Sequence, residues 1–261
     1  LDPLVLEKIL ADPPGPIGAV VVVHALGHPA DTDPLSSLCR AGSIPLIEDA
    51  AGAMGASYKN RPVGSLGDLA IFSFNGNKTV TAGGGGMILT DNERDAAHLH
   101  GLSSQARIGT EYNYSDIGFN FRMTNVNAGL LLAQFERLDE MVSAKRQIAE
   151  NYDRAIVGAD EIQAMPRTSW GSSSCWLYSV LCRSESKAQS LVRHMSENNI
   201  EARTFWRALS GQAPYAQAPR KLTGVAAGLS GTVVSLPSSS SMTAEQQNCV
   251  VEALDIWLRK H

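Results

Sequence analysis

The residue best placed to do chemistry in this sequence is Lys78, in the segment 72–79, Phe-Ser-Phe-Asn-Gly-Asn-Lys-Thr. It follows an apolar run typical of a strand and precedes four consecutive glycines, Gly83 to Gly86. Asp49 comes at the end of an earlier strand-like segment, 45–51. An amine with a carboxylate one strand earlier, and small residues around both, is the combination needed to bind pyridoxal phosphate through a Schiff base. We therefore take Lys78 and Asp49 as the candidate catalytic pair.

Each of these residues also has a purely structural interpretation. Most lysines are solvated, and Lys78 taken alone is an ordinary loop residue. Asp49 could cap a short helix over residues 50–53, or it could pair with a protonated pyridine nitrogen and keep the cofactor able to accept electrons. Ser73 is either a polar residue that ends a strand or a hydroxyl that reaches the cofactor phosphate.

The remaining motifs point to no other chemistry. The glycine run has neither the lysine-serine ending of a P-loop nor the spacing of a dinucleotide-binding turn. His98 and His100 would point to opposite sides of a helix, which makes them a poor metal pair, so no metal is expected. No Gly-x-Ser-x-Gly segment typical of a hydrolase nucleophile is present.

The composition is that of an ordinary globular protein. The chain has 261 residues, of which 44% are hydrophobic and 18% charged, and its formal net charge is −4. Nucleic acids and anionic membranes both require a basic face, so neither is expected as a partner. The longest apolar run, residues 19–23, is too short to span a bilayer. Four cysteines without a Cys-x-x-Cys pair predict buried free thiols and a cytoplasmic location.

Alternating strands and helices predict a mostly parallel sheet covered by helices in the first half of the chain. The expected strands are residues 17–24, 44–47, 69–74 and 87–90, and the expected helices are residues 1–10, 34–41 and 92–100. Asp33 and Asp91 are the expected N-caps of the second and third helices. Ligands in such sheets lie beyond the carboxyl ends of the strands, which places Asp49 and residues 73–78 at the same edge.

The second half of the chain predicts a helical bridge and a small α+β domain. Apolar spacing indicates one or two long helices from Thr124 to Ile156. Beyond them we expect strands near residues 176–182, 202–204 and 232–236, helices over residues 187–198 and 243–260, and a loop over residues 211–231. The predicted division is a large domain over residues 1–123, a connecting part over residues 124–157 and a small domain over residues 158–261.

Five segments occur in the order found in the DegT/StrS-type sugar aminotransferases, and the chain resembles this family over nearly its whole length. The segments are residues 47–51, 72–78, 83–87, 117–124 and 235–239. The Asn-Gly-Asn-Lys form around Lys78 is most similar to the branch that acts in bacillosamine and legionaminic acid pathways. The resemblance implies an α/β enzyme of fold-type I, with a mostly parallel sheet in a large pyridoxal phosphate-binding domain and a small C-terminal α+β domain.

The resemblance also implies a reaction and a set of site residues. Such enzymes are homodimers with shared active sites, and they move an amino group from glutamate to a nucleotide-linked 4-keto-6-deoxy sugar in lipopolysaccharide or other surface polysaccharide biosynthesis. By position, Lys78 would form the Schiff base and Asp49 would pair with the pyridinium nitrogen. Ala51 and Ser73 would contact the cofactor, and Asn120 would reach the phosphate in the neighbouring subunit's site.

Three further residues are candidates for binding substrate. Arg122, Arg203 and Trp206 could hold the donor carboxylate, a phosphate or the nucleotide, because a guanidinium fork or an aromatic face suits each of these groups. Ordinary surface exposure or packing is the alternative for each.

The sequence also departs from the family pattern. Gly52 replaces a longer polar residue that touches the cofactor, and Tyr114 and Ser210 stand where histidines are common. The first helix corresponds to one well inside the large domain, so we expect the chain to lack the N-terminal part of that domain. One alternative is therefore a truncated, non-catalytic homologue that binds pyridoxal phosphate weakly or not at all. A second is a pyridoxal phosphate-dependent sugar dehydratase, which is disfavoured because those relatives carry histidine in place of the lysine.

Overall fold

The computed structural model describes all 261 residues, which form two compact units. Residues 17–139 form one unit, here called the parallel-sheet unit, and residues 1–16 with 140–261 form the other, the antiparallel-sheet unit. The three-part division predicted from the sequence stays a prediction. Nowhere does the chain contain a helix that is both long and apolar enough to cross a bilayer.

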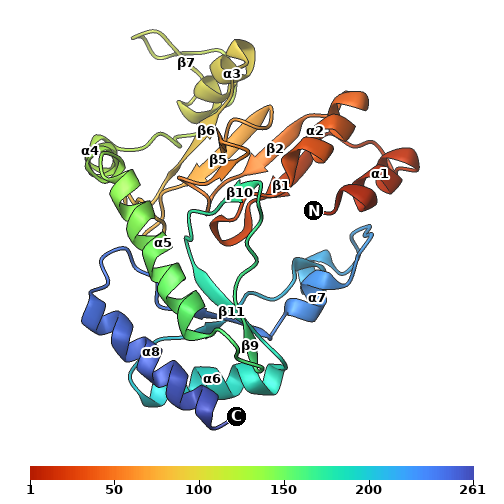
Figure 1. Ribbon diagram of the computed structural model, residues 1–261. Coiled ribbons are helices and arrows are strands. Elements are labelled where there is room, and N and C mark those ends of the chain that lie inside the picture. Colours follow the sequence, from red (N-terminus) through yellow and green to blue (C-terminus); the bar gives the residue numbers. More distant parts are fainter. The chain divides into compact units, whose positions relative to one another are not determined.

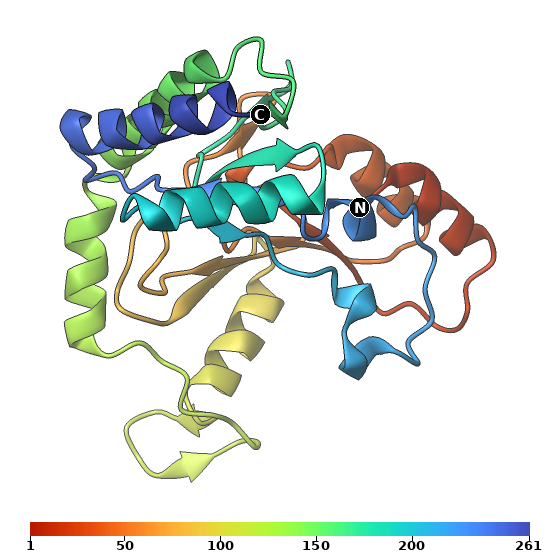
Figure 2. The same ribbon diagram turned by 90° about the horizontal axis from the view of Figure 1, so that it is seen from below.

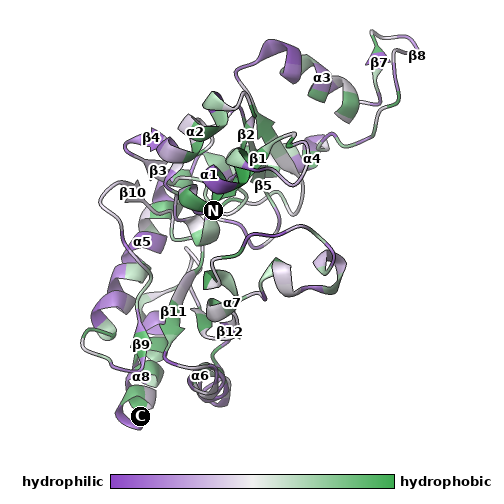
Figure 3. Ribbon diagram, turned by 90° about the vertical axis from the view of Figure 1, so that its right-hand side faces the viewer, coloured by the Kyte–Doolittle hydropathy of each residue, from purple (hydrophilic) through white to green (hydrophobic).

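A four-stranded sheet forms the centre of the parallel-sheet unit (Figure 1). Its strands, in spatial order, are β1 (Val20–Val23), β2 (Leu46–Asp49), β5 (Leu69–Ser73) and β6 (Gly86–Leu89). The first three run parallel, and β6 pairs antiparallel with β5. The β-branched run at residues 20–23 favours a buried strand, and Figure 3 colours β1 as hydrophobic. The expectation of a mostly parallel sheet is confirmed.

Helices and two short hairpins complete this unit. The helices are α2 (Thr32–Ala41), α3 (Glu93–Ser103) and α4 (Asn125–Phe135). The hairpins are β3 (Ser57–Tyr58) with β4 (Arg61–Pro62), and β7 (Arg107–Ile108) with β8 (Asn113–Tyr114).

Two predicted helix caps are wrong by one or two residues. Helix α2 begins after Asp31, so Asp33 lies in its first turn, where its carboxylate pairs with Lys59 and Arg61 of the β3–β4 hairpin. Helix α3 is capped by Asn92, whose side chain accepts hydrogen bonds from the N–H groups of residues 94 and 95. Several polar residues in a row can cap a helix, and tertiary contacts decide which one does.

The antiparallel-sheet unit is built on the strand order β12-β13-β11-β9. The strands are β9 (Ile162–Gln163), β11 (Tyr178–Cys182), β12 (Arg203–Thr204) and β13 (Val233–Leu236), and a further short strand is β10 (Gly171–Ser172). The helices are α1 (Pro3–Ala11), α5 (Leu138–Ala155), α6 (Glu185–Glu197), α7 (Val225–Leu229) and α8 (Ala244–Arg259). Helices α6 and α8 lie side by side (Figure 2).

One hydrophobic core joins the sheet and helices of this unit. Trp257 of α8, Leu191 of α6 and Tyr152 of α5 are almost completely buried against Val180 and Val234 of the sheet. The segment 211–231 was predicted to be loop, but it contains α7 and a short 3-10 turn, Ala213–Tyr215. Cys39, Cys175 and Cys182 are buried free thiols as predicted, whereas Cys249 is exposed on α8.

Candidate active site

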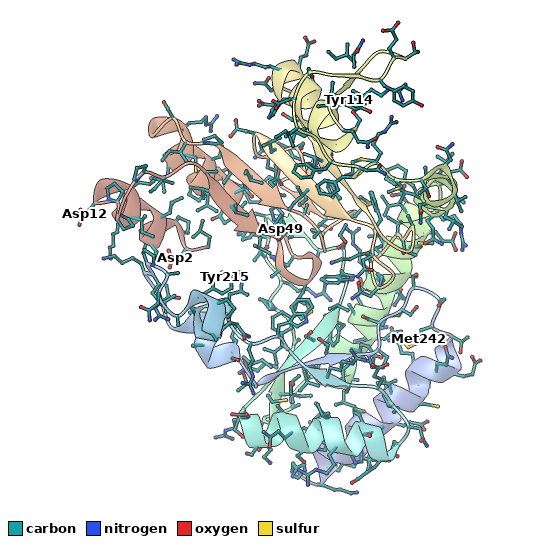
Figure 4. The ribbon with its side chains drawn as sticks, turned by 180° about the vertical axis from the view of Figure 1, so that it is seen from behind. Asp2, Asp12, Asp49, Tyr114, Tyr215 and Met242 are labelled. Carbon is teal, nitrogen blue, oxygen red and sulfur yellow. The ribbon has the colours of Figure 1, made fainter.

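The two faces of the parallel sheet differ in burial, and the candidate residues lie on the open face. Side chains alternate along each strand, so Val20, Val22, Leu46, Glu48, Ala70 and Phe72 form the buried face. Asp49 and Ser73 fall on the opposite face, because Asp49 is paired with Ile71, two residues before Ser73 in β5. That face also exposes Val21, Val23 and Ile71. Asp49 ends β2 (Figure 4), and Ser73 ends the neighbouring strand, so the predicted edge of the sheet is present.

Asp49 caps no helix. Residues 50–55 form turns, and Asp49 Oδ1 accepts the N–H of Ala51 at 3.1 Å in a local turn. Its other carboxylate oxygen, Oδ2, has no hydrogen bond within the protein. Asp49 therefore has a fixed orientation and one oxygen available for a ligand.

Lys78 lies in a loop that closes on the end of β5. The Phe74 carbonyl accepts hydrogen bonds from the Ala82 N–H at 3.0 Å and the Thr81 hydroxyl at 3.1 Å. A turn within this loop joins Lys78 N–H to the Asn75 carbonyl at 3.0 Å. Val80 and Ala82 are buried and anchor the loop, and Lys78 is itself partly buried, so it is not a freely solvated lysine.

The electrostatics of Lys78 connect it to Asp49. Burial lowers the pKa of the half-buried Lys78 amine, and the negative charge of Asp49 opposes that shift. The carboxylate is thus within electrostatic reach of the amine. A lowered pKa increases the fraction of neutral amine near pH 7, and the neutral amine is the nucleophile.

Ser73 has an unused hydrogen-bond donor. Its Oγ accepts the Asn75 N–H at 3.4 Å, and its hydroxyl hydrogen has no acceptor within the protein. Because Ser73 shares the open face with Asp49, this donor is available to a ligand on that face.

The glycine run shapes the backbone of this loop. A Cβ on Gly86 would lie 2.5 Å from the Phe72 carbonyl oxygen, so only glycine lets β6 pair this closely with β5. Gly83 and Gly85 have positive φ values of 78° and 85°, a backbone region that favours glycine.

The other candidate residues of this unit lie on an exposed arm over residues 104–122. Asn120 is exposed and forms an isolated antiparallel bridge with Ser104. Phe119 and Phe121 stack with ring centres 4.9 Å apart, and Arg122 is also exposed. No contact links Asn120 or Arg122 to Lys78 or Asp49, so their predicted roles stay predictions.

Arg203 and Trp206 belong to the antiparallel-sheet unit. Arg203 is exposed and pairs with Glu201. Trp206 is 59% exposed, and its ring lies 5.9 Å from that of Trp176 and 4.8 Å from that of Phe205. An exposed indole on an aromatic cluster suits stacking with a planar group.

Sequence reasoning missed a buried polar pair beneath the site. His24 Nε2 lies 3.0 Å from Glu48 Oε2, and both side chains are fully buried. The available signal was the Glu-Asp dipeptide at the end of β2, because strand alternation must direct one of the two carboxylates into the core.

Comparisons with known proteins agree on one family. The sequence pattern described as the DegT/DnrJ/EryC1/StrS aminotransferase family matches residues 5–255. EpsN of Bacillus subtilis, assigned as a pyridoxal phosphate-dependent aminotransferase, is 38% identical over 90% of this chain and 62% of its own length. The GDP-perosamine synthase of Escherichia coli O157:H7 is 32% identical over 91% of this chain and 65% of its own length. The chain therefore spans less than two thirds of the length of these curated relatives.

The fold also matches solved aminotransferases. The aminotransferase TlmJ from Streptoalloteichus hindustanus superimposes with a TM-score of 0.89 at 26% identity, over 100% of this chain and 72% of TlmJ. The expected fold-type I architecture is confirmed.

Proposed function

This chain belongs to the DegT/DnrJ/EryC1/StrS aminotransferase family, and we propose that it is a pyridoxal phosphate-dependent sugar aminotransferase. It acts as a cytoplasmic homodimer that moves an amino group from glutamate to a nucleotide-linked 4-keto-6-deoxy sugar in surface polysaccharide or glycan biosynthesis. The observation that carries this proposal is the half-buried Lys78 amine within electrostatic reach of Asp49. The E. coli relative, named for a GDP-linked product, supports a nucleotide-linked substrate.

The residues present fit pyridoxal phosphate, the cofactor of this family. An aldehyde requires an amine, and Lys78 supplies one whose pKa is lowered by burial. A pyridine N–H requires an acceptor, and Asp49 Oδ2 is without a hydrogen bond. A phosphate requires donors, and the Ser73 hydroxyl hydrogen is without an acceptor.

Each residue then has a defined task. When bound, pyridoxal phosphate supplies an aldehyde that takes up amino groups and a ring that accepts electrons. Lys78 Nζ would hold the cofactor through its aldehyde and would move the proton at the donor's α-carbon. Asp49 Oδ2 accepts the ring N–H, and the Ala51 N–H orients this carboxylate through Oδ1. Ser73 Oγ donates a hydrogen bond to the phosphate.

The remaining candidates contribute to the shared site and to substrate binding. In the homodimer, Asn120 binds the phosphate in the neighbouring subunit's site, a role that its exposed position on the 104–122 arm permits. Arg122 and Arg203 bind carboxylate or phosphate groups through their guanidinium forks. Trp206 stacks with the nucleotide base, and its exposed ring supports this role.

The test is covalent attachment at one lysine. Purified protein is incubated with pyridoxal phosphate, reduced with borohydride and digested, and the peptides are analysed by mass spectrometry. We expect a phosphopyridoxyl group on Lys78 and its loss in Lys78→Ala. Lys59→Ala is the matched control, because Lys59 is exposed and paired with Asp33. A wild-type chain that retains no cofactor after reconstitution would refute the proposal.

The amino-transfer step is tested separately. The cofactor-loaded protein is supplied with L-glutamate and a nucleotide-linked 4-keto-6-deoxy sugar, and 2-oxoglutarate formation is measured. We expect product with wild type and none with Lys78→Ala. Release of water from the sugar without 2-oxoglutarate would indicate a dehydratase instead.

A further inference from the structure

Glu48, the residue before Asp49 in β2, is a fully buried carboxylate that accepts four hydrogen bonds. The donors are Leu66 N–H at 2.6 Å and Gly67 N–H at 2.8 Å to Oε1, and Gly64 N–H at 2.9 Å and His24 Nε2 at 3.0 Å to Oε2. Burial disfavours the charge, but these hydrogen bonds outweigh it and lower the pKa of Glu48. Glu48 is therefore an ionised acceptor at neutral pH.

His24, directly after β1, connects this carboxylate to the site. Its Nδ1 accepts the Ala30 N–H at 3.0 Å, which leaves the ring proton on Nε2 to be donated to Glu48. Its backbone N–H donates to the Asp49 carbonyl at 3.0 Å. One residue thus binds Asp49 through the main chain and Glu48 through the side chain.

The arrangement lies directly beneath the open face of the sheet. Glu48 and Asp49 are consecutive in β2, so their side chains point to opposite faces. The loop that Glu48 binds, residues 64–67, leads into β5, whose far end continues to Lys78. A single buried carboxylate therefore ties together the end of β1, the end of β2 and the approach to β5.

We propose that His24 and Glu48 are positioning residues that fix the Asp49 carboxylate relative to the Lys78 amine. The roles of Asp49 and Lys78 in this inference rest on the proposed function. The geometry gives the reason. In Glu48→Gln one carboxylate oxygen becomes an NH2 group, which cannot accept a hydrogen bond. That NH2 group would face N–H donors that have no other partner. The main chain at residue 48 must then shift, and Asp49, its neighbour, shifts with it.

The first test needs no cofactor. Lysines are reductively methylated with 13C-formaldehyde, and the Lys78 signal is titrated by NMR, with Lys78→Arg providing its assignment. Because the charge of Asp49 raises the pKa of Lys78 against the effect of burial, Asp49→Asn should lower that pKa further. Glu48→Gln should move the Lys78 pKa in the same direction, towards the Asp49→Asn value.

Matched variants separate positioning from general destabilisation. Tyr58→Phe removes a buried hydroxyl that donates to Asp31 in the same unit and forms no hydrogen bond with His24 or Glu48, so it should leave the Lys78 titration unchanged. His24→Asn keeps an acceptor for the Ala30 N–H but loses the donor to Glu48, so it should reproduce the Glu48→Gln shift. His24→Gln can restore the donor to Glu48 and should move the titration back towards wild type. His24→Asn also decides the question should Glu48→Gln fail to fold.

The second test uses the cofactor-loaded enzyme. If Glu48→Gln or His24→Asn misplaces the Asp49 carboxylate, kcat should fall by about tenfold or more, with a smaller change in KM. Glu48→Gln or His24→Asn with wild-type Lys78 titration and wild-type kcat, but reduced stability, would overturn the proposal. Absence of cofactor binding in wild type would refute the proposed function alone, because the cofactor-free titration still decides the positioning role.

Discussion

Lys145 is a buried lysine whose charge should make the stability of the antiparallel-sheet unit depend on pH. It lies in α5 at 7% exposure, and its Nζ donates to the Ser238 carbonyl at 2.7 Å and the Trp176 carbonyl at 3.2 Å. Burial lowers the pKa of Lys145 from 10.5 to about 8, although Cys175 opposes the shift. We predict that replacing Lys145 with Met changes this pH dependence.

The sign follows from proton counting. Below pH 8 the lysine is protonated in both the folded and unfolded states, so the cost of burying the charge is constant. Between about 8 and 10.5 the unfolded chain still binds a proton that the folded chain has released, so wild-type stability rises with pH. The difference between the two pKa values of Lys145 corresponds to about 3 kcal/mol of stability. Most of this stability should be gained between about pH 7 and pH 10.

The variant lacks this gain. At pH 7, Lys145→Met removes the cost of burying the charge, which stabilises the variant. It also leaves the Trp176 and Ser238 carbonyls without the lysine donor, which costs about 1–3 kcal/mol each. The two effects oppose each other. At pH 10 only the loss of the hydrogen bonds remains. The free energy of unfolding of wild type minus that of the variant should therefore increase by about 2–3 kcal/mol from pH 7 to pH 10.

The assay is urea unfolding of both proteins at several pH values between 7 and 10. Tyrosines and other lysines that titrate in this range are common to both proteins and cancel in the difference. Lys260→Met removes an exposed lysine from the same unit and controls for the change in net charge. A wild-type-minus-variant difference that stays constant with pH would refute the reasoning.

Two further predictions concern the close contact at Gly86 and the reactivity of the cysteines. Gly86→Ala should reduce the free energy of unfolding by about 2 kcal/mol or more, because its Cβ would lie 2.5 Å from the Phe72 carbonyl oxygen. Urea unfolding measures this change, and Gly84→Ala, with no atom within 4 Å of the added Cβ, should cost less than about 0.5 kcal/mol. Burial raises the pKa of Cys182 to about 11, so iodoacetamide at pH 8 should label the exposed Cys249 and spare Cys182 in the native protein. Peptide mass spectrometry reads the labels, and equal labelling of both thiols would contradict the burial argument.

Much of the fold could be predicted because the signals are local. Apolar runs and alternating strand and helix patterns placed the main strands and helices within a few residues of those observed. The exact caps could not be predicted, because Asp31 and Asp33, or Asp91 and Asn92, differ little in intrinsic capping preference. Asp33 lies inside α2 and pairs with Lys59 and Arg61 of the hairpin, which are 26 and 28 residues away in sequence.

The candidate site, too, could be predicted from the sequence only in part. The order Asp49, Ser73, Lys78 along neighbouring parallel strands was enough to predict that the three residues gather at one edge of the sheet. The sequence could not assign His24 a partner, because its contact with Glu48 joins residues from two strands that only the sheet brings together.

The sequence by itself therefore determined the periodicity of the strands and the lysine that follows one of them, since both depend on neighbouring residues in the chain. Only the tertiary structure decided which of Glu48 and Asp49 points to the open face. The tertiary structure also set the lowered pKa of Lys78, because burial and the approach of a carboxylate depend on how distant segments pack.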